Sequence, residues 1–204
     1  ADDQGKWQFK ATSPRPGGPY EMTLTGKNTV TIKNILVGEV WVCSGQSNMQ
    51  WPVRQSANAE QEVASATYPK IRLFSVPRKV ADTPQTDCDG KWVECNPETV
   101  GDFSAVAYFF GRELHQKLDV PVGLIHTSWG GTPAEAWTCG PMLEGNPMLE
   151  PILQRYKDAV ARYPQVKAKY QQDLEQWKKA VEQAKAEGKP APRRPGEPFG
   201  PGSS

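Results

Sequence analysis

The chain has 204 residues, enough for one full domain or one and a half. It is 37% hydrophobic and 23% charged, a composition that supports a globular core. Its 24 basic and 23 acidic residues give a net charge of +1, so nothing indicates binding to nucleic acid or to an anionic membrane surface. No apolar run approaches the ~20 residues that span a bilayer. Because the first residues are polar, we expect no signal peptide within the chain.

Residues 1–37 show the alternation of apolar and polar side chains that is typical of β-strands. Trp7–Lys10 and Tyr20–Thr25 alternate, and Thr29–Val37 follows after a turn signal at Gly26. The pattern predicts about three antiparallel strands, too few to be a stable domain alone. We interpret this segment as the end of a β-sandwich or jelly-roll domain.

From Gly38 the pattern changes to that of an α/β domain. The predicted strand Glu39–Ser44 is almost entirely apolar, as expected for a central strand covered on both faces. Ser47 then lies on the turn that follows this strand. Ligands in open α/β sheets bind beyond the carboxyl ends of the strands, so Ser47 is a candidate nucleophile. The alternative is an ordinary turn rich in Ser, Gly and Asn.

Further strands and helices alternate after this turn. A helix begins near Ser56 or Asn58 and ends at about Ala66. A second helix is capped by Ser104 and ends at about Leu118. Its apolar residues recur every four positions and predict the buried stripe Val106, Phe110, Leu114 and Leu118. The predicted strands are Ile71–Val76, Lys91–Cys95 and Val120–Ser128.

The strand Val120–Ser128 ends in a second glycine turn, at Gly130 and Gly131. In a parallel sheet this turn and Ser47 lie at the same edge. The N–H of Ser47 and the N–H of Gly130 or Gly131 could then point at one substrate oxygen, as in an oxyanion hole. The alternative is a tight strand-to-helix turn that binds no ligand.

Residues 148–188 have a helical pattern that Pro164 interrupts. We therefore expect a helical hairpin packed on the core surface, with its end at Gly188. Residues 189–204 are rich in proline and glycine, which is typical of a linker or lid. One apolar stripe follows Pro164: Val166, Tyr170, Leu174, Trp177, Val181 and Ala184.

The chain contains only two histidines as candidate bases for a serine nucleophile. We interpret His115 as a surface residue beside the polar face of its helix. His126 lies near the end of a strand, and we interpret it as packed under the site and hydrogen-bonded to the backbone. The less favoured alternative is that His126 is the catalytic base. A complete triad therefore cannot be assembled from this chain.

Four cysteines occur without a C-x-x-C pair, and neither metal clusters nor nucleotide-binding glycine motifs are present. We expect no metal and no organic cofactor. Cys88 and Cys95 flank a turn and could form a disulfide in an oxidising compartment. The alternative, which we favour, is that all four cysteines are buried thiols: Cys43, Cys88, Cys95 and Cys139.

Residues 38–52 and 121–137 closely resemble the sialate O-acetylesterase family, of the SGNH/GDSL hydrolase superfamily. The resemblance implies a three-layer α/β/α esterase domain with a parallel, flavodoxin-like sheet. By this resemblance, residues 38–188 are the first half of that domain, with residues 148–188 as an insertion. Residues 1–37 also look like the end of the β-sandwich that precedes the esterase domain in this family.

The resemblance also implies roles for residues at the two turns. Ser47 matches the nucleophile, and the Ser47 N–H with the turn at Gly130 and Gly131 matches two contributors to the oxyanion hole. The family's Tyr-Gln-Gly-Glu-like block and its Asp-x-x-His block, which supplies the catalytic Asp and His, are not in this chain. We therefore expect the chain alone to be inactive and a second polypeptide, or a remaining C-terminal part, to complete the site.

The implied activity is hydrolysis of O-acetyl esters on carbohydrates through an acetyl-serine intermediate. O-acetylated sialic acids are the expected substrates, with acetylxylan or other acetylated polysaccharides as the alternative. An alternative of another class is a noncatalytic carbohydrate-binding or scaffold protein, since the base is absent and the chain has seven tryptophans. The resemblance further implies a secreted, periplasmic or lysosomal location.

Overall fold

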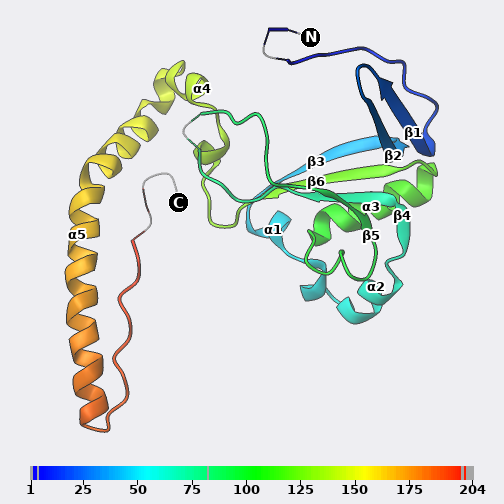
Figure 1. Cartoon of the computed structure of the whole chain (residues 1–204). Helices are drawn as coiled ribbons and strands as arrows, with labels where there is room; N and C mark the ends of the chain where they lie inside the picture. Colours follow the sequence, from blue (N-terminus) through cyan, green and yellow to red (C-terminus); the bar gives the residue numbers. More distant parts are fainter. Residues whose placement is uncertain (1, 4, 82, 199, 201–204) are drawn as a thin grey trace. The chain divides into compact units, whose positions relative to one another are not determined.

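The structure is a computed structural model that describes residues 2–3, 5–81, 83–198 and 200. The chain forms two compact units, residues 1–130 and residues 131–204 (Figure 1). Each unit is described by itself below.

The first unit begins with a β-hairpin. Strands β1 (Gly17–Thr25) and β2 (Thr29–Val37) pair antiparallel, and the N–H of Gly26 closes the turn on the Asn28 carbonyl at 2.8 Å. Two of the three predicted strands are thus present. Residues 7–10 form no strand, because their short alternating run has no partner strand to pair with.

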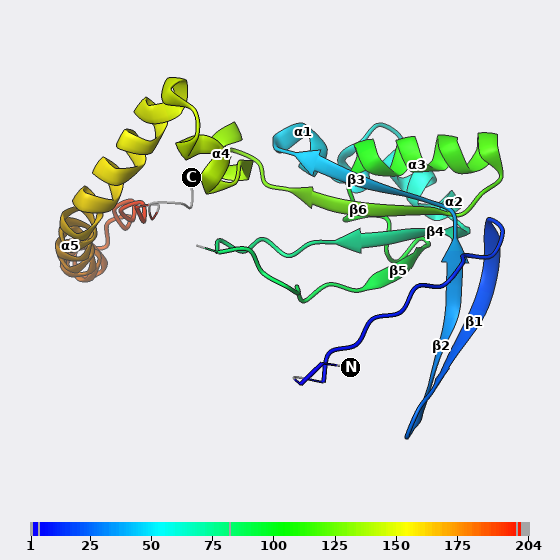
Figure 2. The ribbon, with the colours of Figure 1, turned by 90° about the horizontal axis from the view of Figure 1, so that it is seen from above.

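A four-stranded sheet follows, in the order β3-β6-β4-β5 (Figure 2). Its strands are β3 (Glu39–Gly45), β4 (Tyr68–Ser75), β5 (Trp92–Cys95) and β6 (Val122–Ser128). β3, β6 and β4 run parallel, and β5 pairs antiparallel with β4. All four strands lie within one or a few residues of their predicted positions, so the predicted α/β sheet is confirmed.

The helices of this unit lie on one side of the sheet (Figure 1). They are α1 (Ser47–Gln50), the 3₁₀ turn η1 (Val53–Gln55), α2 (Ala59–Ser65) and α3 (Ala105–Leu118). As predicted, Ser104 caps α3, and its hydroxyl accepts a hydrogen bond from the Ala107 N–H at 3.2 Å.

The core lies between α3 and the sheet. At Gly111 the helix approaches β6 so closely that a Cβ would lie 2.6 Å from a methyl group of Leu124. Small residues on this face of α3 allow that approach. The largest fully buried side chains are Tyr108, Ile71, Leu73, Leu124, Val53, Val100 and Val122.

One polar network crosses the core between α2 and α3. The Tyr108 hydroxyl donates to the Glu62 carboxylate at 2.6 Å, and Arg112 forms an ion pair with the same oxygen. Burial raises the pKa of Glu62, but the hydrogen bonds from Tyr108 and Arg112 outweigh it and lower the pKa overall. The carboxylate is therefore held ionised, and it joins the two helices.

Within the described part of this chain, the prediction that strand 39–44 is a central strand covered on both faces is wrong. β3 is an edge strand with a neighbour on one side only among the described strands, and Val40, Trp41 and Val42 are exposed. The apolar pattern requires cover on both faces, but the pattern alone does not say which polypeptide provides it.

The predicted buried stripe of the helix at 104–118 is also wrong. Val106, Phe110 and Leu118 are exposed, and Leu114 is only partly buried. The face that packs on the sheet carries Ala105, Ala107, Tyr108 and Gly111 instead. α3 therefore has two apolar faces, and Val106, Phe110 and Leu118 lie on the one that the sheet does not cover.

The second unit is dominated by one long helix, α5 (Glu150–Ala186). It follows the turn η2 (Ala134–Trp137), α4 (Gly140–Glu144) and η3 (Pro147–Leu149). The predicted helical hairpin is wrong, because α5 continues through Pro164 as a single helix. Figure 1 shows α5 bending in its first half (yellow), where a proline inside a helix removes one hydrogen bond and favours a kink.

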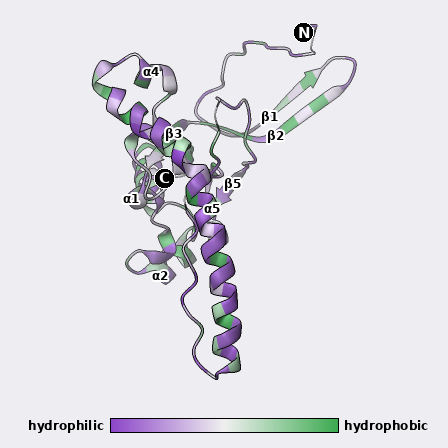
Figure 3. Ribbon diagram, turned by 90° about the vertical axis from the view of Figure 1, so that its left-hand side faces the viewer, coloured by the Kyte–Doolittle hydropathy of each residue, from purple (hydrophilic) through white to green (hydrophobic). Residues whose placement is uncertain are grey.

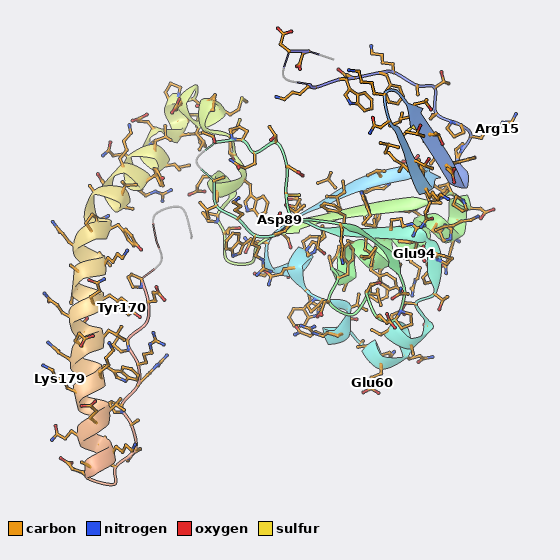
Figure 4. The ribbon with its side chains drawn as sticks, viewed as in Figure 1. Arg15, Glu60, Asp89, Glu94, Tyr170 and Lys179 are labelled. Carbon is orange, nitrogen blue, oxygen red and sulfur yellow. The ribbon has the colours of Figure 1, made fainter. Side chains whose placement is uncertain are left out.

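The predicted stripe of α5 is half-buried from Tyr170 onward, whereas its first residue, Val166, is exposed, and Trp177 of the stripe contacts the proline-rich segment that returns along the helix. The Trp177 indole N–H donates to the Pro192 carbonyl at 2.8 Å, and the Arg194 guanidinium lies 5.9 Å from the Trp177 ring centre. Figure 4 shows Tyr170 on the side facing this segment and Lys179 on the opposite side. The remaining surface of α5 is mostly hydrophilic (Figure 3).

The predicted end of the helix is confirmed. Gly188 has φ +67°, and the Lys189 N–H donates to the Ala184 carbonyl at 2.8 Å. This is the Schellman arrangement that glycine favours after a helix. The helices of the described chain are each too short or too polar to cross a bilayer.

All four cysteines are free thiols in the structure, so Cys88 and Cys95 do not form the disulfide that the sequence allowed. Cys43 and Cys95 are buried as predicted, whereas Cys88 and Cys139 are exposed. Burial, followed by the negative charge of Glu62, raises the pKa of Cys95 to about 12. This thiol therefore stays protonated at neutral pH.

Candidate active site

Ser47 lies at the carboxyl end of β3, as the first residue of α1. Gly45 makes the turn between strand and helix with φ +152°, and a Cβ there would lie only 3.1 Å from that of Met49. The side chain of Ser47 is exposed. Its N–H is among the first of a helix, which have no partner within the helix.

The turn after β6 lies directly against Ser47. The Trp129 N–H donates to the Gly45 carbonyl at 3.1 Å, which continues the parallel pairing of the two strands past their ends. At Gly130 a Cβ would lie 3.1 Å from the Ser47 hydroxyl oxygen and 3.4 Å from the Ser47 Cα. The structure therefore brings Ser47 and Gly130 together at one edge of the sheet.

The side chain of Gln50 completes this contact, a feature that the sequence reasoning missed. Its carbonyl oxygen Oε1 accepts a hydrogen bond from the Gly130 N–H at 2.6 Å. Gln50 follows Ser47 by three residues in a helical turn, a spacing that places two side chains on the same face. That spacing was the signal available in the sequence.

Gly131 begins the second unit and has φ +84°, a conformation that favours glycine. No atom lies within 4 Å of a Cβ built at this position. The backbone there is thus accessible.

His126 does not bond to Ser47 in the described structure. Its Nε2 lies 2.5 Å from the Ser128 hydroxyl, and its ring contacts Phe103 edge-on at 5.4 Å between ring centres. Burial, and then the positive charge of Arg78, lower the pKa of His126, although a backbone hydrogen bond with Met49 opposes them. The ring is neutral and packed below the turn, as the favoured interpretation predicted.

His115 is half-buried at the end of α3, where its Nδ1 lies 2.7 Å from the Val120 carbonyl and donates to it. The prediction that it is a surface residue is therefore wrong, because this hydrogen bond draws the ring inward. Among the described residues, neither histidine is bonded to Ser47, and no group of three acidic, Cys or His side chains could hold a metal ion.

A family model described as carbohydrate esterase, sialic acid-specific acetylesterase, matches residues 37–185. The chain is 40% identical to the sialate O-acetylesterase of Rattus norvegicus over 146 residues and to that of Homo sapiens over 152 residues. These alignments cover 65% and 68% of this chain.

A solved structure, a carbohydrate acetylesterase from Xanthomonas citri, is similar with a TM-score of 0.67 and 36% identity, over 72% of this chain and 34% of that one. The chain spans 27% of the length of the rat relative and 29% of the human relative. The relatives are thus much longer than the part that this chain matches.

Proposed function

Because this chain belongs to the sialic acid-specific acetylesterase family of carbohydrate esterases, we propose that it carries the nucleophile of an esterase that removes O-acetyl groups from sialic acids. The observation that carries the proposal is the contact between Ser47 and Gly130 at the carboxyl ends of two parallel strands. That edge is where open α/β sheets bind their ligands. The serine is exposed there, so a substrate carbonyl can reach it.

The proposed reaction is acyl transfer to Ser47. The hydroxyl loses its proton to a base and forms a bond to the acetyl carbonyl carbon, whose oxygen becomes an oxyanion. The C–O bond to the sugar then breaks, and the sugar oxygen takes the proton from the base. Water attacks the resulting acetyl-serine in the same manner and releases acetate. The chemistry requires no metal or organic cofactor.

The oxyanion is proposed to accept hydrogen bonds from the Ser47 N–H and from the glycine turn at Gly130 and Gly131. Each such donor stabilises the transition state by about 3 kcal/mol. In the structure the Gly130 N–H is bound to Gln50. A substrate oxygen would therefore either displace the Gln50 amide or bind the Gly131 N–H. Gly131 lies in an exposed turn and has φ +84°.

The base is proposed to come from a further segment or a second polypeptide that carries an Asp-x-x-His sequence. His126 is bound to Ser128 and has a lowered pKa, and His115 lies at the far end of α3. The relatives' additional length leaves room for such a segment. We accordingly expect the 204-residue chain alone to be inactive. This dependence also makes a noncatalytic carbohydrate-binding protein the rival proposal.

The test is acetate release by the complete gene product that contains these residues. We expect hydrolysis of p-nitrophenyl acetate and of O-acetylated sialic acid, with O-acetylated sialic acid preferred over acetylxylan. Ser47→Ala should lower kcat/KM at least ~1000-fold, because no other group replaces the nucleophile. Ser65→Ala, an exposed serine at the end of α2, is the matched control and should retain full activity.

Full activity of Ser47→Ala would exclude Ser47 as the nucleophile. Binding of O-acetylated sialic acid without acetate release by the complete protein would favour the noncatalytic alternative. A preference for acetylxylan would move the substrate from sialic acids to plant polysaccharides.

We also propose an extracytoplasmic location, supported by the family to which the chain belongs. Free cysteines neither support nor oppose this location. Fractionation of the source cells, with the esterase activity as the marker, tests it.

A further inference from the structure

Gln50 is the last residue of α1, and its side chain is half-buried (Figure 2 shows α1 beyond the arrowhead of β3). Its Oε1 accepts the hydrogen bond from the Gly130 N–H at 2.6 Å. Because an N–H can bond only to the oxygen end of an amide, this partner fixes which way the Gln50 amide faces. It is the one hydrogen bond of this side chain within the described part of the chain. Gln50 thus connects α1 to a residue 80 positions later in the sequence.

Two consecutive residues of the turn after β6 are bound to the turn that carries Ser47. The Trp129 N–H donates to the carbonyl of Gly45, which precedes Ser47, at 3.1 Å. The Gly130 N–H donates to the side chain of Gln50, which follows Ser47. The nucleophile therefore lies between the two points of attachment, and loss of either bond would let the glycine turn shift relative to it.

Gly130 depends on this bond more than another residue would. Glycine has no side chain that could pack and hold its backbone in place. The pairing of β6 with β3 ends at Ser128, so strand pairing does not fix Gly130 either. A larger residue does not fit, because a Cβ at this position would lie 3.1 Å from the Ser47 hydroxyl oxygen and 2.8 Å from the Gln50 Oε1. The close approach thus requires glycine, and the acceptor on Gln50 supplies the restraint that glycine lacks.

The same bond restrains the N–H groups that the proposed oxyanion hole uses. While the Gly130 N–H is bound to Gln50, it does not donate to a substrate. The Ser47 N–H and the Gly131 N–H then remain as the proposed donors. The peptide unit between Gly130 and Gly131 is planar, so the position of Gly130 limits where the Gly131 N–H can point.

We propose that Gln50 is a positioning residue of the esterase reaction, which holds Gly130 and so keeps the glycine turn at the distance from Ser47 that the oxyanion requires. The inference rests on the proposed function. Gln50 acts through the backbone of Gly130 and does not contact the substrate. Because a misplacement of ~1 Å lowers a reaction rate about 100-fold, loss of this restraint affects the chemical step more than it affects substrate binding.

The test measures kcat and KM for p-nitrophenyl acetate and O-acetylated sialic acid with variants of the full gene product. Gln50→Met keeps the length of the side chain but removes the oxygen acceptor, and it should lower kcat about 10- to 100-fold with KM within about twofold of wild type. Gln50→Glu keeps an oxygen at the same distance, and its kcat should stay within about fivefold of wild type. Gln50→Ala replaces Gln50→Met if the thioether disturbs folding, and it should cause the same loss.

The matched control is Gln61→Met, which makes the same exchange at an exposed glutamine of α2. It should keep the kcat and KM of the wild type.

Hydrogen–deuterium exchange provides a readout that does not depend on activity. In Gln50→Met, the Gly130 N–H should exchange about fivefold faster than in the wild type, because it loses its acceptor. In Gln50→Glu and Gln61→Met the exchange rate should not change. Melting temperatures should differ by no more than about 4 °C, since one neutral hydrogen bond contributes little to global stability. A larger fall in Gln50→Met would show a general structural role and overturn the inference.

Three kinetic results would also overturn the inference while leaving the esterase proposal intact. The first is a wild-type kcat in Gln50→Met, and the second is a loss of kcat that Gln50→Glu does not recover. The third is an unchanged kcat with a lower KM, which would show that Gln50 only competes with the substrate for the Gly130 N–H. Absence of acetate release by the wild type is a different result, because it overturns the esterase proposal and the role of Gln50 together.

Discussion

Ser47 and Gly130 approach so closely that any side chain added at position 130 would disturb both turns. A Cβ at Gly130 would lie 2.8 Å from the Gln50 Oε1 and 3.1 Å from the Ser47 hydroxyl oxygen. Each distance is short enough to force a neighbour to move. Gln50 is a flexible side chain and can move, whereas the backbone of Ser47 is fixed by β3 and α1.

The first prediction concerns Gly130→Ala in the full gene product. We expect kcat/KM for acetyl ester hydrolysis to fall about 10- to 100-fold, because a small displacement of a nucleophile or oxyanion donor has effects of that size. Thermal stability should change little. Acetate release and a melting curve measure the two effects.

The control for this substitution is Gly140→Ala, since no atom lies within 4 Å of a Cβ built at that glycine. It should leave kcat/KM unchanged. An unchanged kcat/KM in Gly130→Ala as well would show that the contact between the two turns has no role in the reaction.

At the scale of single elements, α5 illustrates how local preference and observed structure differ. Pro164 lies inside a helix of 37 residues, where it has no N–H to donate and crowds the carbonyl four residues earlier. The helix continues because its second half is stabilised by contacts with the returning segment, including the hydrogen bond from Trp177 to Pro192.

The second prediction is that Pro164→Ala stabilises α5. The cost of an interior proline is about 3 kcal/mol relative to alanine, so up to that amount should be gained in the free energy of unfolding. Circular dichroism at the helical minimum, followed during urea unfolding, measures it. Lys167→Ala, at an exposed position one turn away, should change the free energy by less than about 0.5 kcal/mol. A loss of stability in Pro164→Ala would show that the bend itself is required.

At the scale of the whole molecule, stability depends on pH through the groups whose pKa the fold lowers, and Glu62 and His126 are the partly buried ones among them. Glu62 has an ordinary pKa of 4.5, and His126 one of 6.5. For each group the unfolded chain binds a proton at a higher pH than the folded chain does. The free energy of unfolding therefore falls as the pH falls below each ordinary value.

The third prediction is an acid-sensitive stability with two separable windows. In the wild type the free energy of unfolding decreases below pH 6.5, because the unfolded chain protonates His126 before the folded chain does. It decreases again below pH 4.5, because the unfolded chain likewise protonates Glu62 first. Glu62→Gln should reduce the slope of the lower window by the share that Glu62 contributes, while the exposed Glu94, Glu175 and Glu187, whose pKa is also lowered, keep theirs. It should also lower stability at pH 7, because Arg112 loses its charged partner. His126→Gln should flatten only the upper window. Urea unfolding between pH 3 and 8 gives these curves.

Each of these two variants serves as the control for the other. If Glu62→Gln left the lower window unchanged, the polar network between α2 and α3 would not be the cause of acid sensitivity. If His126→Gln left the upper window unchanged, the buried imidazole would not titrate with unfolding.

The amino-acid sequence by itself determined the local helices and strands and which two turns form the site. The strands other than the one predicted at residues 7–10, the Ser104 cap and the end of α5 at Gly188 depend on neighbouring residues, and the structure confirms them. The meeting of Ser47 with Gly130 also followed from sequence, because parallel strands place their carboxyl ends at one edge. These properties need only near neighbours or a single pairing rule.

The tertiary structure alone decided which apolar faces are covered and which polar groups are satisfied. Spacing predicts that β3 and α3 have apolar faces, but only the packing shows that the stripe of Val106 and Phe110 is open and that Gly111 faces the sheet. Likewise, the spacing of Gln50 from Ser47 indicates a shared face of the helical turn, but it does not specify the hydrogen bond from the Gly130 N–H to Gln50. Spacing does not specify the hydrogen bond between His126 and Ser128 either. Burial and hydrogen-bond partners join residues far apart in the chain, and a local pattern does not specify which distant segment arrives.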